Sequence, residues 1–167
     1  MDDIYFKTGQ VEEAISIMRE AAQWLIDVGR PMWAMDELTR EAVRNPDDEF
    51  IVLYSGDHAG IAACTLSLAD KYIWSDVPDN TSGFIHKLSV RRKFAGQGYA
   101  ARLIQYAAQL CRERDIYELR LDCDPHRKGL CEFYESAGFK LLEVKTIVTH
   151  KLGEIDLAMY KMELRRC

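Results

Sequence analysis

Apolar residues recur at helical spacing in several stretches of the chain. From about Gln10 to Val28 every third or fourth residue is apolar, which predicts an amphipathic helix ending at Gly29 and Pro31. The same spacing predicts a helix from about Ala100 to Arg114 and a shorter one closed by Gly138. The apolar positions of the first helix are Val11, Ile15, Met18, Ala22 and Leu25. Trp24 in the same helix also stands at helical spacing and is therefore expected in the core.

A further helix is predicted from about Met35 to Arg44. It should end at Asn45, because the residue before a proline is pushed out of the helical region and Pro46 follows. With the first helix it makes a helical hairpin.

Short runs rich in β-branched and aromatic residues fill most of the remaining chain. Phe50–Tyr54 and Ile61–Leu66 predict two antiparallel strands, because the residues between them, 55–58, form a good hairpin turn. Ala69–Gly83 is polar and predicts a loop. Further strands are predicted at 84–90, 117–123, 139–150 and 155–164, whereas residues 4–6 give only a short apolar start.

The order of these elements predicts one α/β (α+β) domain over residues 1–167. The strand at 84–90, the helix after it and the strand at 117–123 form a β-α-β unit, whose strands should lie parallel with a right-handed crossover. The last two predicted strands are joined by a turn near Gly153. A length of 167 residues fits one domain, since domains usually contain about 100–200 residues.

Composition narrows the functional class. The chain is 48% hydrophobic and 29% charged, and its formal net charge of -5 disfavours binding to nucleic acid. No apolar stretch reaches the roughly 20 residues of a membrane span, and the acidic N-terminus is unlike a signal peptide, so a cytoplasmic protein is expected. The five cysteines fit neither a disulfide framework nor a zinc pair, so we expect reduced thiols and no metal.

Two glycines, Gly96 and Gly98, stand between the strand at 84–90 and the next predicted helix. A turn of this kind exposes backbone N–H groups beside the positive end of the helix dipole, which favours a phosphate. Turn geometry alone accounts for the two glycines equally well, so both interpretations stay open at this point. The pattern is not a Walker A loop, and Ala101 occupies the third position of a GxGxxG motif, which excludes both of those phosphate loops.

The arrangement resembles the GNAT superfamily of N-acetyltransferases, whose motif is Gln or Arg, two residues, Gly, one residue, then Gly or Ala. Residues 95–100 match it with Gly98 as the fixed glycine and Ala100 as the small last residue, while Ala95 departs at the first position. Residues 84–90 and 119–123 resemble the family's fourth and fifth strands. Phe133–Phe139 reads FYESAGF, close to the family's FYExxGF segment.

The resemblance implies the GNAT fold, a mixed and mostly antiparallel sheet of about six to seven strands that is splayed between its fourth and fifth strands, with about four helices. It also implies acetyl-CoA as cofactor, and a neighbouring Lys93 or Arg92 as the source of the charge missing at Ala95. The expected cofactor-binding residues are Leu88, Ser89, Val90, Lys93, Phe94, Ala95, Gly96, Gln97, Gly98, Tyr99, Ala100, Arg127 and Tyr134.

Catalytic roles follow from the same resemblance. Tyr134 lies where many family members carry the general acid that protonates the coenzyme A sulfur, although a core aromatic on a helix is the alternative. The backbone N–H of Leu88 or Val90 is expected to bind the carbonyl oxygen. His86 has a pKa range suited to a general base, but a structural histidine or a chain of water molecules is the alternative.

The resulting hypothesis is an acetyl-CoA-dependent N-acetyltransferase that acts on a primary amine of a small molecule or a peptide. An acyl-CoA-binding regulatory module without turnover is the alternative. No motif identifies the acceptor, and a homodimer stays open.

Overall fold

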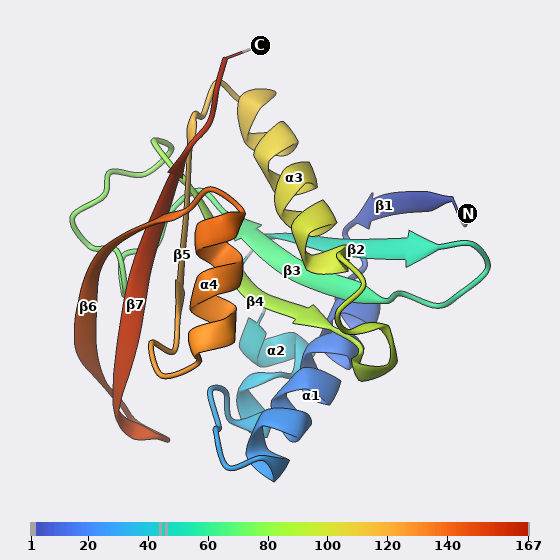
Figure 1. Ribbon diagram of the computed structural model, residues 1–167, viewed down its shortest axis with the longest axis horizontal. Helices are drawn as coiled ribbons and strands as arrows, with labels where there is room; N and C mark the ends of the chain where they lie inside the picture. The colour runs from blue at the N-terminus through green and yellow to red at the C-terminus, as the bar shows by residue number, and fades with distance from the viewer. Residues whose placement is uncertain (1–2, 44, 46, 167) are drawn as a thin grey trace. The chain divides into compact units, whose positions relative to one another are not determined.

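The computed structural model describes residues 3–43, 45 and 47–166. Within these residues it contains seven strands, four α-helices and two short 3-10 helices, labelled as in Figure 1. Their bounds are β1 Ile4–Thr8, α1 Val11–Asp27, η1 Met35–Glu37, α2 Arg40–Val43, β2 Glu49–Ser55, β3 Ala62–Ser67, β4 Gly83–Val90, η2 Arg92–Phe94, α3 Tyr99–Arg112, β5 Glu118–Cys123, α4 Lys128–Ser136, β6 Lys140–Thr149 and β7 Gly153–Glu163.

The strands form one mixed sheet with the hydrogen-bonded order β1-β2-β3-β4-β5-β7-β6. By its packing the chain divides into two units. The first unit comprises the chain up to Ser67 together with Ile85–Ala107, and the second comprises Leu68–Phe84 together with the chain from Ala108 onward. Each unit is described by itself below.

The first unit is built on the antiparallel strands β1, β2 and β3, which lie side by side in Figure 1. Helix α1 packs on β2 and β3 and buries its apolar side between them. The residues of α1 that are buried are Ala14, Ile15, Ile17, Met18, Ala22 and Leu25, in good agreement with the predicted stripe. Gly29, with φ +76°, ends the helix and donates its N–H to Ile26.

The prediction of one continuous helix from about Met35 to Arg44 is wrong. The chain forms η1 and then the short helix α2, with Leu38 between them at φ −105° and ψ 55°. Arg19 of α1 explains the break, since its guanidinium donates to the carbonyl oxygens of both Met35 and Leu38. Thr39 then accepts the N–H of Ala42 through its hydroxyl at the start of α2. The predicted last residue, Arg44, lies outside the described residues, as does Pro46.

The second unit contains β5, β7 and β6, joined antiparallel, and the first residues of β4. Gly83 and Phe84 pair in parallel with Leu119 and Arg120 of β5. Trp74, from the long loop before β4, packs with Phe84, Leu157 and Met159 into a buried cluster. This loop is therefore part of the core of its unit and not only a surface connection.

The predicted fold class is confirmed, with a mixed sheet and a parallel pair between β4 and β5. The splay between these strands and the extent of one domain over residues 1–167 stay predictions. One strand was missed. The sequence indicated only a short apolar start at residues 4–6, but the structure has strand β1 there, which pairs with β2 from Ile4↔Ser55 to Thr8↔Ile51. Among the described residues, no helix is both long enough and apolar enough to cross a bilayer.

Candidate functional site

Strand β4 departs from a regular strand conformation at Lys87, directly before the residues expected to bind the cofactor, 88–90. Lys87 has φ +54°, a left-handed conformation that is uncommon for a residue with a Cβ atom. The Ser89 hydroxyl donates to the carbonyl oxygen of Lys87 at 2.9 Å, and Ser89 itself is buried. His86, Lys87 and Leu88 are all partly exposed, so the normal alternation of a strand is interrupted there. Residues held in sparsely populated backbone conformations cluster at ligand sites.

The glycine turn follows directly. Gly96 and Gly98 have φ +75° and +86°, and both are exposed. A Cβ built on either glycine would meet no heavy atom within 4 Å, so the space over the turn is open. The glycines are needed for backbone conformation and leave room for a ligand to approach the main chain.

Helix α3 begins at this turn. The carbonyl oxygen of Gly98 accepts the N–H of Arg102 at 3.3 Å, which makes Gly98 the N-cap residue. The N–H groups of Gly98, Tyr99, Ala100 and Ala101 therefore have no acceptor within the helix. Because α3 has 14 residues, its dipole adds partial positive charge at these amides. Amides and dipole together favour an anionic group such as a phosphate.

Aromatic contacts hold the turn in place. Phe94 lies edge-on to Tyr99, with ring centroids 6.1 Å apart, and 5.4 Å from the ring of His58. Gln97 donates its side-chain amide to the carbonyl oxygen of Lys93 at 3.4 Å. Phe94, Gln97 and Tyr99 thus stabilise the loop through their side chains, which is compatible with a role of their backbone in binding.

The three basic residues before the turn differ in their surroundings. Arg91 is half-buried beside two carboxylates of α1, and the guanidinium of Arg92 stacks 3.8 Å from the ring centroid of Trp24. Trp24 is partly exposed, so the expectation that it lies in the core is wrong. Lys93 is exposed, with its Nζ 5.0 Å from the ring centroid of Phe94.

In the second unit, Tyr134 lies buried on α4, 5% exposed. Its ring contacts those of Phe133, Phe139 and Tyr160 at centroid distances of 5.3, 5.9 and 6.2 Å. These contacts fit the core aromatic that the sequence left as an alternative, and they fix the ring for any chemical role. Gly138, at φ +109°, then turns the chain so that Phe139 can donate its N–H to the carbonyl oxygen of Tyr134.

Tyr160, beneath α4, donates its hydroxyl to Glu135 at 3.2 Å. Burial, followed by the neighbouring Cys131 thiol and Glu135, raises the pKa of Tyr160, so this hydroxyl stays protonated. Cys131 also lies 3.8 Å from the sulfur of Cys123, and burial is the main cause that raises the pKa of the Cys123 thiol. The four described cysteines are free thiols, and Cys167 lies outside the described residues.

Arg127, expected to bind the cofactor, is the residue before the first turn of α4 and is partly exposed. Its N–H donates to the carbonyl oxygen of Asp124. The neighbouring His126 ring lies 3.0 Å from the carboxylate of Asp124, which holds this loop. Arg127 and Tyr134 both belong to the second unit, the first directly before α4 and the second within it, whereas His86 and residues 88–100 belong to the first unit.

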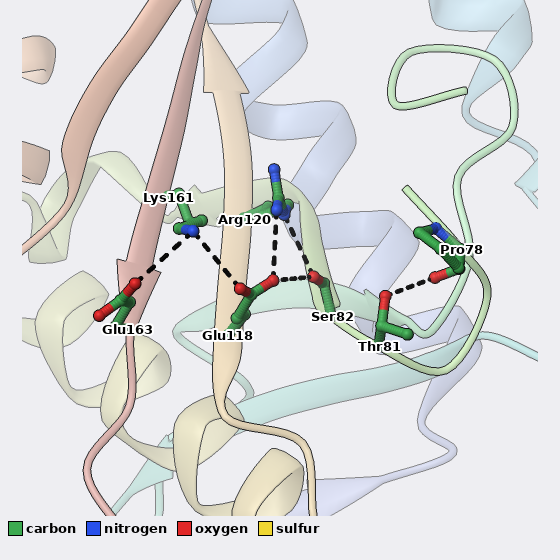
Figure 2. Close-up of polar contacts among 7 residues, drawn as sticks. All are labelled: Pro78, Thr81, Ser82, Glu118, Arg120, Lys161 and Glu163. Carbon is green, nitrogen blue, oxygen red and sulfur yellow. Dashed lines mark hydrogen bonds and ion pairs between the residues drawn. The ribbon is translucent and has the colours of Figure 1, made fainter. Parts of the chain in front are cut away.

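A polar network that the sequence did not predict joins Ser82, the residue before β4, to strands β5 and β7 in the second unit, and Figure 2 shows it. Glu118 accepts hydrogen bonds from Ser82 at 2.8 Å and from Arg120 at 3.2 Å, and lies 3.4 Å from the Nζ of Lys161. Burial alone would raise the pKa of Glu118, but these hydrogen bonds and the two cations lower it on balance. Part of this network could have been predicted from the sequence, because residues alternate between the two faces of a strand and Glu118 and Arg120 of β5 therefore share one face.

The acetyltransferase (GNAT) family matches residues 15–139. An uncharacterized N-acetyltransferase, YesJ of Bacillus subtilis (strain 168), is 27% identical over 151 residues, which cover 84% of each chain.

Solved structures share the fold. The ribosomal-protein-S18-alanine N-acetyltransferase from Escherichia coli has a TM-score of 0.71 at 14% identity, covering 100% of this chain and 96% of its own. The PaiA N-acetyltransferase from Thermoplasma acidophilum, solved in complex with coenzyme A, has a TM-score of 0.69 at 15% identity, covering 96% of this chain and 99% of its own.

Proposed function

Because the chain belongs to the acetyltransferase (GNAT) family, we propose that it transfers the acetyl group of acetyl-CoA to a primary amine of a small molecule or a peptide. The observation that carries the proposal is the open turn at Gly96 and Gly98. It presents amides without helical acceptors at the start of α3, next to exposed Lys93. This combination suits the diphosphate of coenzyme A.

The residues of the turn fit that group in two respects. Neither glycine carries a Cβ atom that would occupy the space over the amides, and Ala95, also exposed, has an extended backbone at φ −63° and ψ 147°. Replacement of the family's Gln or Arg by Ala95 removes a side chain but no amide. We therefore expect the main chain to supply most of the binding and Lys93 to add charge.

Acetyl-CoA, when bound, supplies a thioester carbonyl that an amine can attack. The chain's own residues have roles assigned by their positions in the family motifs. The N–H of Leu88 or Val90 donates to the carbonyl oxygen as its charge increases. The hydroxyl of Tyr134 gives a proton to the departing thiolate, and His86, or water in its place, accepts the proton of the amine.

A direct assay tests the proposal. The purified protein is incubated with acetyl-CoA and a panel of primary amines, including short peptides, while mass spectrometry records acetylated products and a thiol reagent records released coenzyme A. We expect acetyl transfer to at least one amine class. Binding of coenzyme A with neither transfer nor hydrolysis would favour the alternative, a regulatory module, and no binding at all would contradict the proposal.

A further inference from the structure

One side of helix α1 fastens the chain that leads into the glycine turn. Glu13, Ser16, Glu20 and Trp24 follow at intervals of three or four residues, so they lie along one side of the helix. All four contact Arg91 or Arg92, which are more than 65 positions away in the sequence. The contacts join α1 to the residues immediately before the turn.

Arg91 is the more buried of the two basic residues, with its side chain 18% exposed. Its Nη2 lies 3.3 Å from Glu13 and 3.2 Å from the hydroxyl of Ser16, and its Nε donates to the carbonyl oxygen of Gly60 at 2.7 Å. The main-chain N–H of Arg91 donates to the carbonyl oxygen of Ile61 at 2.9 Å. Arg91 is thus held from both sides, and its charge is compensated inside the protein.

Glu20 acts on the main chain of the next residue. One carboxylate oxygen accepts the backbone N–H of Arg92 at 2.8 Å, and the other lies 3.5 Å from the Nη1 of Arg91. Arg92 is the first residue of η2, whose own N-cap residue makes no side-chain capping bond. Glu20 therefore supplies from α1 the acceptor that the first turn of η2 lacks locally.

We infer that Glu20 is a positioning residue for the cofactor turn. Through Arg92 it sets where η2 begins, and η2 leads within four residues to Gly98 and to the first amides of α3, which have no acceptor within the helix. The inference rests on the proposed function, because it assigns Glu20 to the binding of acetyl-CoA. Loss of the acceptor loosens the entry to the turn and weakens cofactor binding without changing the chemistry of transfer.

Two substitutions separate the parts of this contact. Glu20→Gln keeps an oxygen that can accept the N–H of Arg92 but loses the ion pair with Arg91, whereas Glu20→Ala removes both. We expect KM for acetyl-CoA and Kd for coenzyme A to rise about threefold in Glu20→Gln and roughly tenfold in Glu20→Ala. The value of kcat at saturating acetyl-CoA should stay within about twofold of the unmodified protein.

Glu12→Gln is the matched control. Glu12 lies on the same helix and pairs with Arg40 at the surface, so the substitution removes the same charge without touching the turn. Both KM and Kd should stay unchanged in this variant. A general effect of charge on α1 would instead change all three variants alike and would overturn the inference.

The first measurement is a calorimetric titration of the unmodified protein with coenzyme A, which shows whether that protein binds it. If that protein does not bind coenzyme A, the proposed function and this inference both fail. If it binds, and Glu20→Gln and Glu20→Ala bind equally well while only their melting temperatures fall, Glu20 has a structural role and the inference alone is overturned. Should Glu20→Ala not fold, the comparison of Glu20→Gln with Glu12→Gln decides the question in the same way.

Discussion

Arg120 and Glu118 lie two residues apart on β5 with their side chains on one face of the strand, and Nη2 of Arg120 is 3.2 Å from the carboxylate of Glu118. Ser82 donates to the same carboxylate, and Arg120 also lies over the ring of Trp74 at 5.1 Å from its centroid. The pair thereby links the residue before β4 and the long loop to the centre of the second unit.

This relationship predicts a pH dependence of stability. Burial opposes ionisation of Glu118, but its hydrogen bonds and cations outweigh burial, so its folded pKa lies below the ordinary 4.5. A lowered folded pKa gives stability that is fully present above pH 4.5 and is lost as pH falls through the folded pKa. In Glu118→Gln this part of the acid dependence should disappear, so the difference in unfolding free energy from the unmodified protein should shrink between pH 6 and pH 3, as measured by urea denaturation.

Glu163→Gln provides the comparison for that experiment. Glu163 lies 3.7 Å from Lys161 but is 80% exposed, so its ion pair is screened by water. Its substitution should leave the pH profile almost unchanged. Equal profiles for both variants would show that the Glu118 network does not couple protonation to folding.

Gly98→Ala tests the backbone requirement of the turn. A Cβ at position 98 would meet no atom within 4 Å, so crowding within the protein does not decide the outcome. The left-handed conformation at φ +86° does, and it should cost about 1 kcal/mol of folding stability. Gly98→Val adds a branched side chain in the space over the amides and should abolish coenzyme A binding, which calorimetry measures.

Gly129→Ala is the control for that strain. Gly129 lies in α4 with an ordinary backbone conformation and open space beside it, so alanine there should stabilise the protein by about 0.5–1 kcal/mol. Thermal unfolding of the two alanine variants should therefore shift in opposite directions. Normal coenzyme A affinity in Gly98→Val would show that the turn is not part of the binding site.

Gly60→Ala is expected to weaken the fold in the first unit. A Cβ at position 60 would come within 2.6 Å of Cγ1 of Val52 and 2.7 Å of Cγ of Glu13, both closer than van der Waals contact. Either the backbone or both side chains have to move; Val52 is fully buried, and Glu13 is also a partner of Arg91. We expect a loss of about 1–3 kcal/mol in the free energy of unfolding, measured by urea denaturation. An unchanged midpoint would show that Val52 and Glu13 both move away at no cost.

Tyr134→Phe tests the proposed general acid. The variant keeps the ring contacts and removes only the hydroxyl, so kcat should fall roughly 100-fold while Kd for coenzyme A changes little. Tyr160→Phe removes a neighbouring hydroxyl, the one bonded to Glu135, and should lower stability rather than kcat. If kcat is unchanged in Tyr134→Phe, the tyrosine is a core aromatic only.

The parts of the fold that the sequence predicted correctly depend on local patterns. Helix α1 could be read from the spacing of Ile15, Met18, Ala22 and Leu25, and the turn from two glycines before an apolar stripe. Strand β1 was missed because its five residues carry little alternation of their own and are ordered by pairing with β2, more than 40 residues away. The break at Leu38 likewise depends on Arg19, a contact that no local propensity contains.

The same reasoning applies to the candidate site. The glycines and Tyr134 stand in motifs that a single sequence can reveal, whereas the positions of Arg91 and Arg92 depend on carboxylates and a tryptophan in a distant helix. The left-handed conformation of Lys87 was also invisible, because lysine has no preference for it. Motif reading therefore identified the residues expected to touch the ligand and missed those that hold the motif in place.

The side of α1 that contacts Arg91 and Arg92 matters for anyone who shortens or recombines this protein. The match to the family begins at residue 15, two positions after Glu13, and a protein trimmed there would lose β1 and the carboxylate closest to Arg91. Grafting the glycine loop with α3 onto another scaffold would likewise leave two arginines without their partners. The smallest transferable unit of this turn therefore includes the first helix, although more than 60 residues separate the two along the chain.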